Sequence, residues 1–214
     1  MSFKGRIEAK CPSCSETEEV EVWTFVRADM DGRLRDALLG GDLNLLCCPD
    51  CGALYYPEST VVYSDPGAEL LAFIFPPSYA AEEARWRKKM REDHDEMQAA
   101  LKGKTEPLLG EPLLCFGLEP FREILQADDD LEDEARVAEY LCKDLGLELA
   151  AVERAFARGK RLPCLLPVGK SGAPRTKAGV LAALSAVVKA NDRLEGFSRW
   201  LEQVRAEGLP PFKP

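Results

Sequence analysis

Two Cys-Pro-x-Cys motifs carry the residues best suited to chemistry in this chain of 214 residues. The first spans Cys11–Cys14, and the second spans Cys48–Cys51 and is followed by Gly52. Each motif presents two thiols on one tight turn in which proline restricts φ, and Gly52 after the second motif tolerates positive φ. Zinc in structural sites takes four such ligands in a tetrahedron, with no coordination position left for a substrate. The motifs therefore predict one structural Zn²⁺ per chain, held by Cys11, Cys14, Cys48 and Cys51.

Redox chemistry by one motif is the rival interpretation, because Cys-x-x-Cys is also the thioredoxin pattern. That pattern belongs to a βαβ context, which the neighbouring sequence does not have, and it does not explain a second motif. The other four cysteines are expected in the core. Alternation along a strand would turn Cys47 away from the metal and into the core, and the core is also expected for Cys115, Cys142 and Cys164.

The first third of the chain must position these cysteines, and its pattern is mostly that of β-strands. Between the two motifs, a helix is predicted over 32–40, capped by Asp31 and ended by Gly40-Gly41. The motifs would then lie at one end of a sheet. Alternating, β-branched and aromatic residues predict strands over 4–10, 19–26, 43–47, 53–56, 60–63 and 69–75.

After Ser78 the pattern becomes helical. Residues 80–101 contain no glycine or proline and predict a long, charged helix with a narrow apolar stripe. A loop over 103–112 and a strand over 112–116 follow, and a later loop is predicted over 163–174. The acidic run Asp128–Asp130 is interpreted as the approach to a helix N-terminus. Further helices are predicted over 119–126, 132–145, 148–158, 175–190 and 192–206.

Around these motifs the chain resembles the CpXC family of prokaryotic proteins, which is named for two Cys-Pro-x-Cys motifs. The resemblance covers about residues 5–145, and it implies a zinc site and a domain boundary but no activity. Ser15 stands where a glycine often follows the first motif in the family. Besides the cysteines, the resemblance rests on Gly41–Asn44 (GDLN), Tyr63–Asp65 (YSD), Phe116–Ile124 (FGLEPFREI) and the acidic Asp129-Asp130.

Charge and hydropathy exclude some classes of function. The formal net charge is −9, from 28 basic and 37 acidic residues, which argues against a general nucleic-acid binder. The charge is uneven, since residues 111–150 carry −9 and residues 151–214 carry +7. The apolar runs over 70–75 and 180–188 are far shorter than the ~18–20 residues of a membrane span, and the charged start is unlike a secretory signal. We expect a soluble protein of the reducing cytoplasm.

These observations predict an α+β fold: a zinc-ribbon-like mixed or antiparallel β domain with a long helix, plus a C-terminal α-helical extension. We expect a CpXC-like zinc-binding domain over 1–146 and the extension over 147–214. The expected function is a non-enzymatic, zinc-stabilised protein-interaction module of a bacterial cell, with a protein partner or self-association and no membrane contact. Two alternatives stay open: a nucleic-acid-associated regulator that uses the basic C-terminal region, and an enzyme whose active site the sequence does not reveal.

Overall fold

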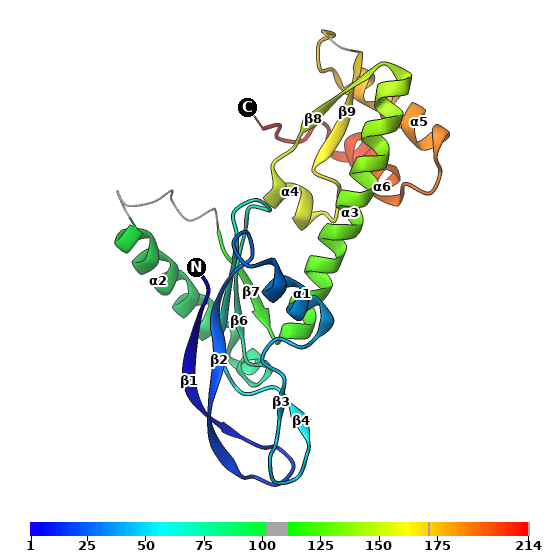
Figure 1. Ribbon diagram of the computed structural model, residues 1–214. Helices are drawn as coiled ribbons and strands as arrows, with labels where there is room; N and C mark the ends of the chain where they lie inside the picture. Colours follow the sequence, from blue (N-terminus) through cyan, green and yellow to red (C-terminus); the bar gives the residue numbers. More distant parts are fainter. Residues whose placement is uncertain (102–110, 171, 214) are drawn as a thin grey trace. The chain divides into compact units, whose positions relative to one another are not determined.

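The computed structural model describes residues 1–101, 111–170 and 172–213 and has the α+β fold that was predicted (Figure 1). The chain forms two compact units, Met1–Ile124 (unit 1) and Leu125–Pro214 (unit 2), and the division falls inside helix α3 (Leu118–Leu145). The domains over 1–146 and 147–214 stay a prediction. Most of the loop predicted over 103–112 lies outside the described residues. In the described ranges, no helix is long and apolar enough to cross a membrane.

Unit 1 is built on a mixed five-stranded sheet with the strand order β1-β2-β5-β6-β7. Antiparallel pairing joins β1 to β2 and β5 to β6, whereas the β2–β5 and β6–β7 pairs are parallel. The sheet is therefore of the mixed type, one of the two types predicted. Its strands span Phe3–Lys10 (β1), Thr17–Arg27 (β2), Val61–Asp65 (β5), Leu70–Phe75 (β6) and Leu113–Phe116 (β7).

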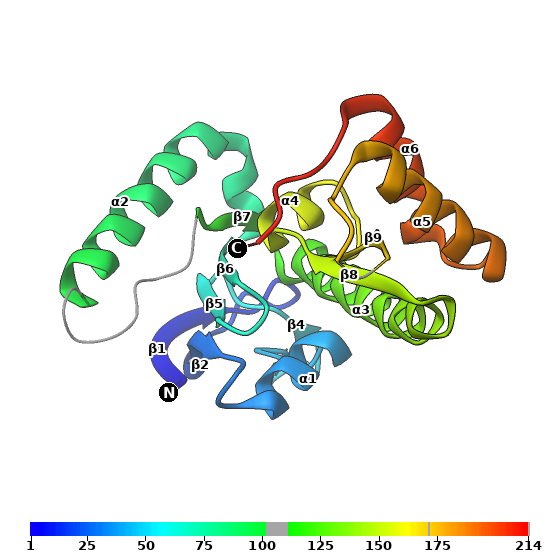
Figure 2. The same cartoon turned by 90° about the horizontal axis from the view of Figure 1, so that it is seen from above.

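Strand β6 is the centre of unit 1, because all six of its residues are buried. Neighbouring side chains of a strand point to opposite faces, so both faces of this strand are covered. On one face its aromatic residues pack with Met90 of helix α2. On the other face Tyr63 of β5 contacts Phe121 of α3, with ring centres 4.9 Å apart. Figure 2 shows α2 (Glu83–Leu101) and α1 (Gly32–Gly40) on opposite sides of the sheet; a 3-10 helix, η1 (Pro77–Glu82), precedes α2.

The first Cys-Pro-x-Cys motif lies at the far end of a ribbon that β1 and β2 form. Only Phe25–Arg27 of β2 pair with β5, so most of β1 and β2 extends beyond the rest of the sheet. The hairpin of β3 (Leu46–Cys47) and β4 (Leu54–Tyr55) lies beside this end of the ribbon and carries the second motif (Figure 1). The motifs therefore meet at one end of the sheet, as predicted.

Unit 2 packs helices against a two-stranded antiparallel sheet of β8 and β9. Figure 2 shows this sheet between α3 and the pair of helices α5 and α6. Cys142 of α3, Leu184 of α5 and Trp200 of α6 belong to one buried cluster. The elements of this unit after α3 are β8 (Leu147–Ala151), α4 (Arg154–Gly159), β9 (Leu165–Lys170), α5 (Lys177–Ala190) and α6 (Glu195–Glu207).

Three predictions for the C-terminal part of the chain are wrong in detail. Helix α3 is one continuous helix, and Asp128–Asp130 lie in its middle rather than before a second helix. Residues 147–151 form strand β8, and β9 occupies part of the loop predicted over 163–174. The C-terminal extension therefore contains a β-hairpin as well as helices, because strand pairing satisfies the backbone groups of two segments that bury Ala150 and Leu166.

The basic C-terminal segment and the acidic half of α3 belong to the same unit. Unit 2 carries 14 basic and 14 acidic residues and is formally neutral, whereas unit 1 carries the whole net charge of −9. The contact between the two segments is largely apolar, since the side chains of Ala138 and Cys142 share a buried cluster with α5 and α6. One ion pair, Arg158 with Asp128 at 2.7 Å, is itself mostly buried.

Candidate metal centre

The two Cys-Pro-x-Cys turns have the same backbone geometry. The amide of Ser15 donates to the carbonyl oxygen of Cys11 at 2.9 Å, and the amide of Gly52 donates to that of Cys48 at 2.9 Å. Both residues after the turns have positive φ, 63° at Ser15 and 71° at Gly52. Glycine adopts this conformation without strain, whereas serine does so at a cost. Ser15 therefore occupies the position at which the other turn uses glycine, and both motifs are in the predicted register.

The four cysteines of the motifs come together as one cluster. Their Sγ atoms all lie within 4.8 Å of one another. The shortest distances cross between the two turns: 3.7 Å from Cys11 to Cys51 and 3.6 Å from Cys14 to Cys48. No disulfide joins them. Among the cysteine, histidine and acidic side chains of the described residues, these four cysteines form the group that could hold a metal ion.

A small apolar cluster supports the turns from one side. Cys11 and Cys48 are buried in it together with Ala9 and Tyr55, and Cys14 and Cys51 are exposed. The cluster is much smaller than the cores beneath β6 and in unit 2. A region with so little buried apolar surface depends on another source of stability, for which a bound metal ion is a common solution.

The thiols differ in their affinity for protons. The backbone N–H of Cys14 is the main cause that lowers the pKa of Cys11 to about 7. At Cys14 the N–H of Glu16 acts in the same direction, but partial desolvation and the neighbouring thiols raise the pKa to about 12. The pKa of Cys51 is also raised, because desolvation and its neighbours outweigh the N–H of Ala53. Four thiolates this close repel one another, and a bound cation removes that obstacle.

Metal binding should therefore release protons. At pH 8, Zn²⁺ binding should release about two protons or more, because Cys14 and Cys51 are still protonated there. Between pH 8 and pH 6, Cys11 also becomes protonated, so the number released should rise and the apparent affinity should fall as the pH falls. Calorimetric titrations in buffers of different ionisation enthalpy measure this number. Release of less than one proton at pH 8 would contradict the assignment of these thiols as ligands.

The prediction that Cys47 lies in the core is wrong, because its side chain is exposed. The alternation itself holds, since Leu46 is partly buried, Cys47 is exposed and Cys48 is buried. The error lies in the assumption of a second covered face. Strand β3 has two residues and pairs with β4 in a two-stranded sheet, and among the described residues its outer face stays exposed at Cys47. The Sγ of Cys47 lies 3.7 Å from the carbonyl oxygen of Gly52.

The remaining cysteines follow the prediction more closely. Cys115 and Cys142 are buried, and Cys164 is half-buried. Desolvation raises the pKa of both buried thiols to about 11, so they are neutral at physiological pH. They behave as small apolar residues of the two cores.

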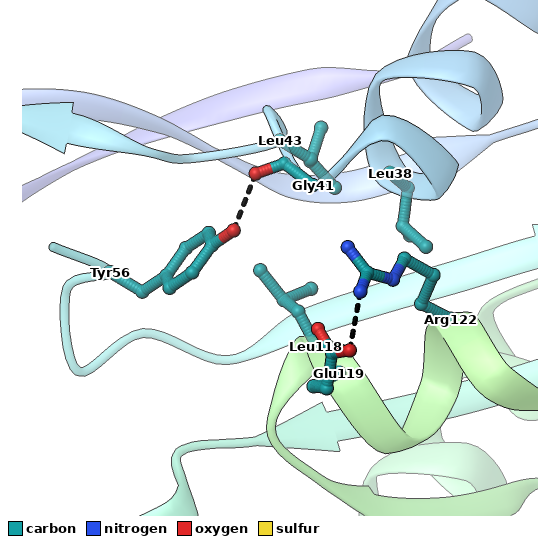
Figure 3. Close-up of a pocket in the computed structure, with 7 residues that line it drawn as sticks. All are labelled: Leu38, Gly41, Leu43, Tyr56, Leu118, Glu119 and Arg122. Atoms are coloured by element: carbon teal, nitrogen blue, oxygen red, sulfur yellow. Dashed lines mark hydrogen bonds and ion pairs between the residues drawn. The ribbon is translucent and has the colours of Figure 1, made fainter. Parts of the chain in front are cut away.

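Two sequence segments outside the cysteine motifs also meet in unit 1. Gly41 and Leu43 come from GDLN, and Leu118, Glu119 and Arg122 come from FGLEPFREI; together with Leu38 and Tyr56 they line a small pocket. In Figure 3 the hydroxyl of Tyr56 donates to the carbonyl oxygen of Gly41, and Arg122 forms an ion pair with Glu119. A larger cavity shares Tyr56, Leu118 and Glu119 with this pocket. Neither cavity was predicted from the sequence.

Both segments lie within the part of the chain that matches a protein-family model. The model of the family described as CpXC protein matches residues 9–138, which is more than half of the chain and includes all four clustered cysteines. No curated protein and no solved structure matches the chain significantly.

Proposed function

The chain belongs to the CpXC protein family, and we propose that unit 1 is a non-enzymatic, zinc-stabilised protein-interaction module. The observation that carries this proposal is the cluster of four thiols within 4.8 Å of one another. Thiolates are soft ligands, and a set of four without nitrogen or oxygen ligands favours zinc or iron. We choose zinc because Zn²⁺ has no redox chemistry and therefore needs no electron-transfer partner.

The distances fit a zinc ion. With Zn–S bonds of about 2.3 Å, the sulfurs of a regular tetrahedron stand about 3.8 Å apart. The two shortest distances, 3.7 Å and 3.6 Å, are close to that edge length. Cys11, Cys14, Cys48 and Cys51 would hold the ion, which would join the β1–β2 ribbon to the β3–β4 hairpin. Four protein ligands complete the tetrahedron, which supports a structural role and not a catalytic one.

An exposed apolar side chain next to the cluster supports the interaction role. Leu54 lies on β4, three residues after Cys51, and exposes 66% of its surface. Zinc would fix the hairpin that presents this side chain. Exposed apolar groups on a rigid surface are typical of contact sites for other proteins, although single ones are common. The proposal therefore needs a test directed at Leu54.

Met30 provides a matched control for that test, because it exposes the same fraction, 66%. Affinity-tagged full-length protein is captured from host cells as wild type, Leu54→Ser and Met30→Ser, and the wild type is also treated with a zinc chelator. We expect one specific protein, or a second copy of this chain, to copurify with wild type and with Met30→Ser. It should be lost from Leu54→Ser and after chelation. Equal capture in all four samples would contradict the proposal.

The nucleic-acid alternative has less support from the described residues. The basic segment that would contact phosphates shares unit 2 with an equal number of acidic residues. Arg158 and Arg175 pair with Asp128 and Glu148, at 2.7 Å and 3.7 Å. Phosphate binding needs an accessible basic face, which these pairs reduce.

A further inference from the structure

Unit 1 contains a cavity that the zinc site does not use. Its volume is about 350 Å³, and it lies where β6 and β7 end and α3 begins. This volume is within the range of about 300–1,000 Å³ that is usual for small-molecule sites. Asn44 of the GDLN segment and Phe116–Pro120 of the FGLEPFREI segment contribute to its lining. The walls are mainly apolar, so the cavity suits a ligand with an apolar body.

We propose that this cavity binds an organic cation, a protonated amine joined to an aromatic or branched apolar body.

The Ser59 hydroxyl and the first-turn N–H groups of α3 are hydrogen-bond donors of the lining, but the rest of the lining offers few to an anion. Four of its residues are prolines, which have no N–H: Pro57, Pro76, Pro77 and Pro120. Several other donors already have partners inside the protein. The Tyr56 hydroxyl donates to the Gly41 carbonyl (Figure 3), and the Asn44 amide donates to the Trp23 carbonyl at 2.9 Å. The amide of Gly117 donates to the carbonyl of Phe75 at 2.8 Å.

The same lining offers groups that attract a cation. Tyr56 is an aromatic residue of the lining, and the face of an aromatic ring attracts an ammonium group, whereas the rings of Phe75 and Phe116 pack against each other and the Phe75 ring packs against Trp86. Glu119 is the charged residue among those that line the cavity. Its carboxylate is paired with Arg122 through one oxygen, and a carboxylate can accept several hydrogen bonds. The positive end of α3 also lies here, but Glu119 in its first turn offsets that charge.

The net charge of unit 1 also favours a cation over an anion. The unit carries 23 acidic and 14 basic residues, a net charge of −9. A negative surface raises the local concentration of cations and lowers that of anions.

Three probes of similar shape test the proposal: phenethylamine, hydrocinnamate and phenethyl alcohol. They are titrated into full-length, zinc-loaded, isotopically labelled protein, and the NMR shifts of the Phe116 and Gly117 amides are followed. We expect saturable shifts with phenethylamine, about fivefold weaker binding of the alcohol, and the weakest binding for hydrocinnamate. Hydrocinnamate that binds as tightly as the amine would overturn the proposal, as would a complete absence of saturable shifts with the amine.

Two isosteric variants on α3 test the role of the carboxylate. Glu119→Gln removes the charge at the cavity, whereas Glu123→Gln removes the same charge from an exposed position outside the lining. Glu119→Gln should weaken phenethylamine about fivefold and leave phenethyl alcohol unchanged, and Glu123→Gln should change neither. Equal affinity of both variants for the amine would contradict the assignment of Glu119. Zinc content is measured in each sample, so failure of this proposal is distinguished from failure of the metal site.

Discussion

Replacing Cys48 with serine should abolish metal binding and unfold the end of the β1–β2 ribbon. Cys48 is buried among the other thiols, and a hydroxyl is a poor substitute for a thiolate ligand. Structural zinc contributes about 10–16 kcal/mol of apparent binding free energy in small zinc domains. The net stability of a domain is only about 5–15 kcal/mol. The loss should appear as absent metal by elemental analysis and as rapid hydrogen exchange over residues 8–20 and 46–55.

Cys47 is the matched control, because it is the neighbouring residue and carries the same thiol on the exposed side of β3. Cys47→Ser should retain one zinc ion per chain and change the free energy of unfolding by less than about 0.5 kcal/mol. The contrast depends on the register of the second motif. If Cys47→Ser loses the metal and Cys48→Ser retains it, the ligand set is wrong by one residue.

Trp200→Ala should destabilise unit 2 by about 3–5 kcal/mol without release of zinc. The side chain of Trp200 is fully buried, and its Nε1–H donates to the carbonyl oxygen of Pro163 at 2.9 Å. Truncation leaves a cavity in the cluster and an unpaired buried carbonyl group. Hydrogen exchange over β9, α5 and α6 measures the effect.

Glu202→Ala is the control for that variant, because Glu202 is an exposed residue of the same helix, α6. It should change the free energy of unfolding of unit 2 by no more than about 0.5 kcal/mol. Equal protection of the amides of unit 2 in Trp200→Ala and Glu202→Ala would show that Trp200 does not hold this core together.

The arrangement of the clustered thiols follows from local chemistry, which is why it could be predicted. Each Cys-Pro-x-Cys turn is fixed within six residues, from Cys11 to Glu16 and from Cys48 to Ala53, by the same pair of backbone hydrogen bonds. Strand β6 was also predictable, because a run of six apolar residues between a turn and two prolines suits a strand buried on both faces.

The errors in unit 2 come from contacts between distant residues. Leu149, Val152 and Phe156 have helical spacing, yet residues 147–151 pair with β9. Pro167 and Gly169 indicated a loop, but β9 has only one partner strand, and Pro167 lies opposite Leu149 beside an irregularity in the register. In α3, the acidic run does not end the helix, because Asp128 pairs with Arg158 and no glycine or proline follows before residue 146.

The exposure of Cys47 and the cavity beside Glu119 depend on what covers each face of the fold. Strand alternation gives the direction of a side chain but not the presence of a second layer. The cavity forms where a loop, two strand ends and a helix start meet, and its lining residues are separated by up to 76 positions from Asn44 to Pro120. No pattern in the sequence indicated that these distant residues line one cavity.

Native mass spectrometry of the full-length chain, purified under reducing conditions without chelator, tests the central claim most directly. The account predicts one Zn²⁺ per chain in wild type and in Cys47→Ser, and none in Cys48→Ser. Elemental analysis of the same samples distinguishes zinc from iron. A folded wild-type chain that carries no metal, or that carries iron in place of zinc, would contradict it.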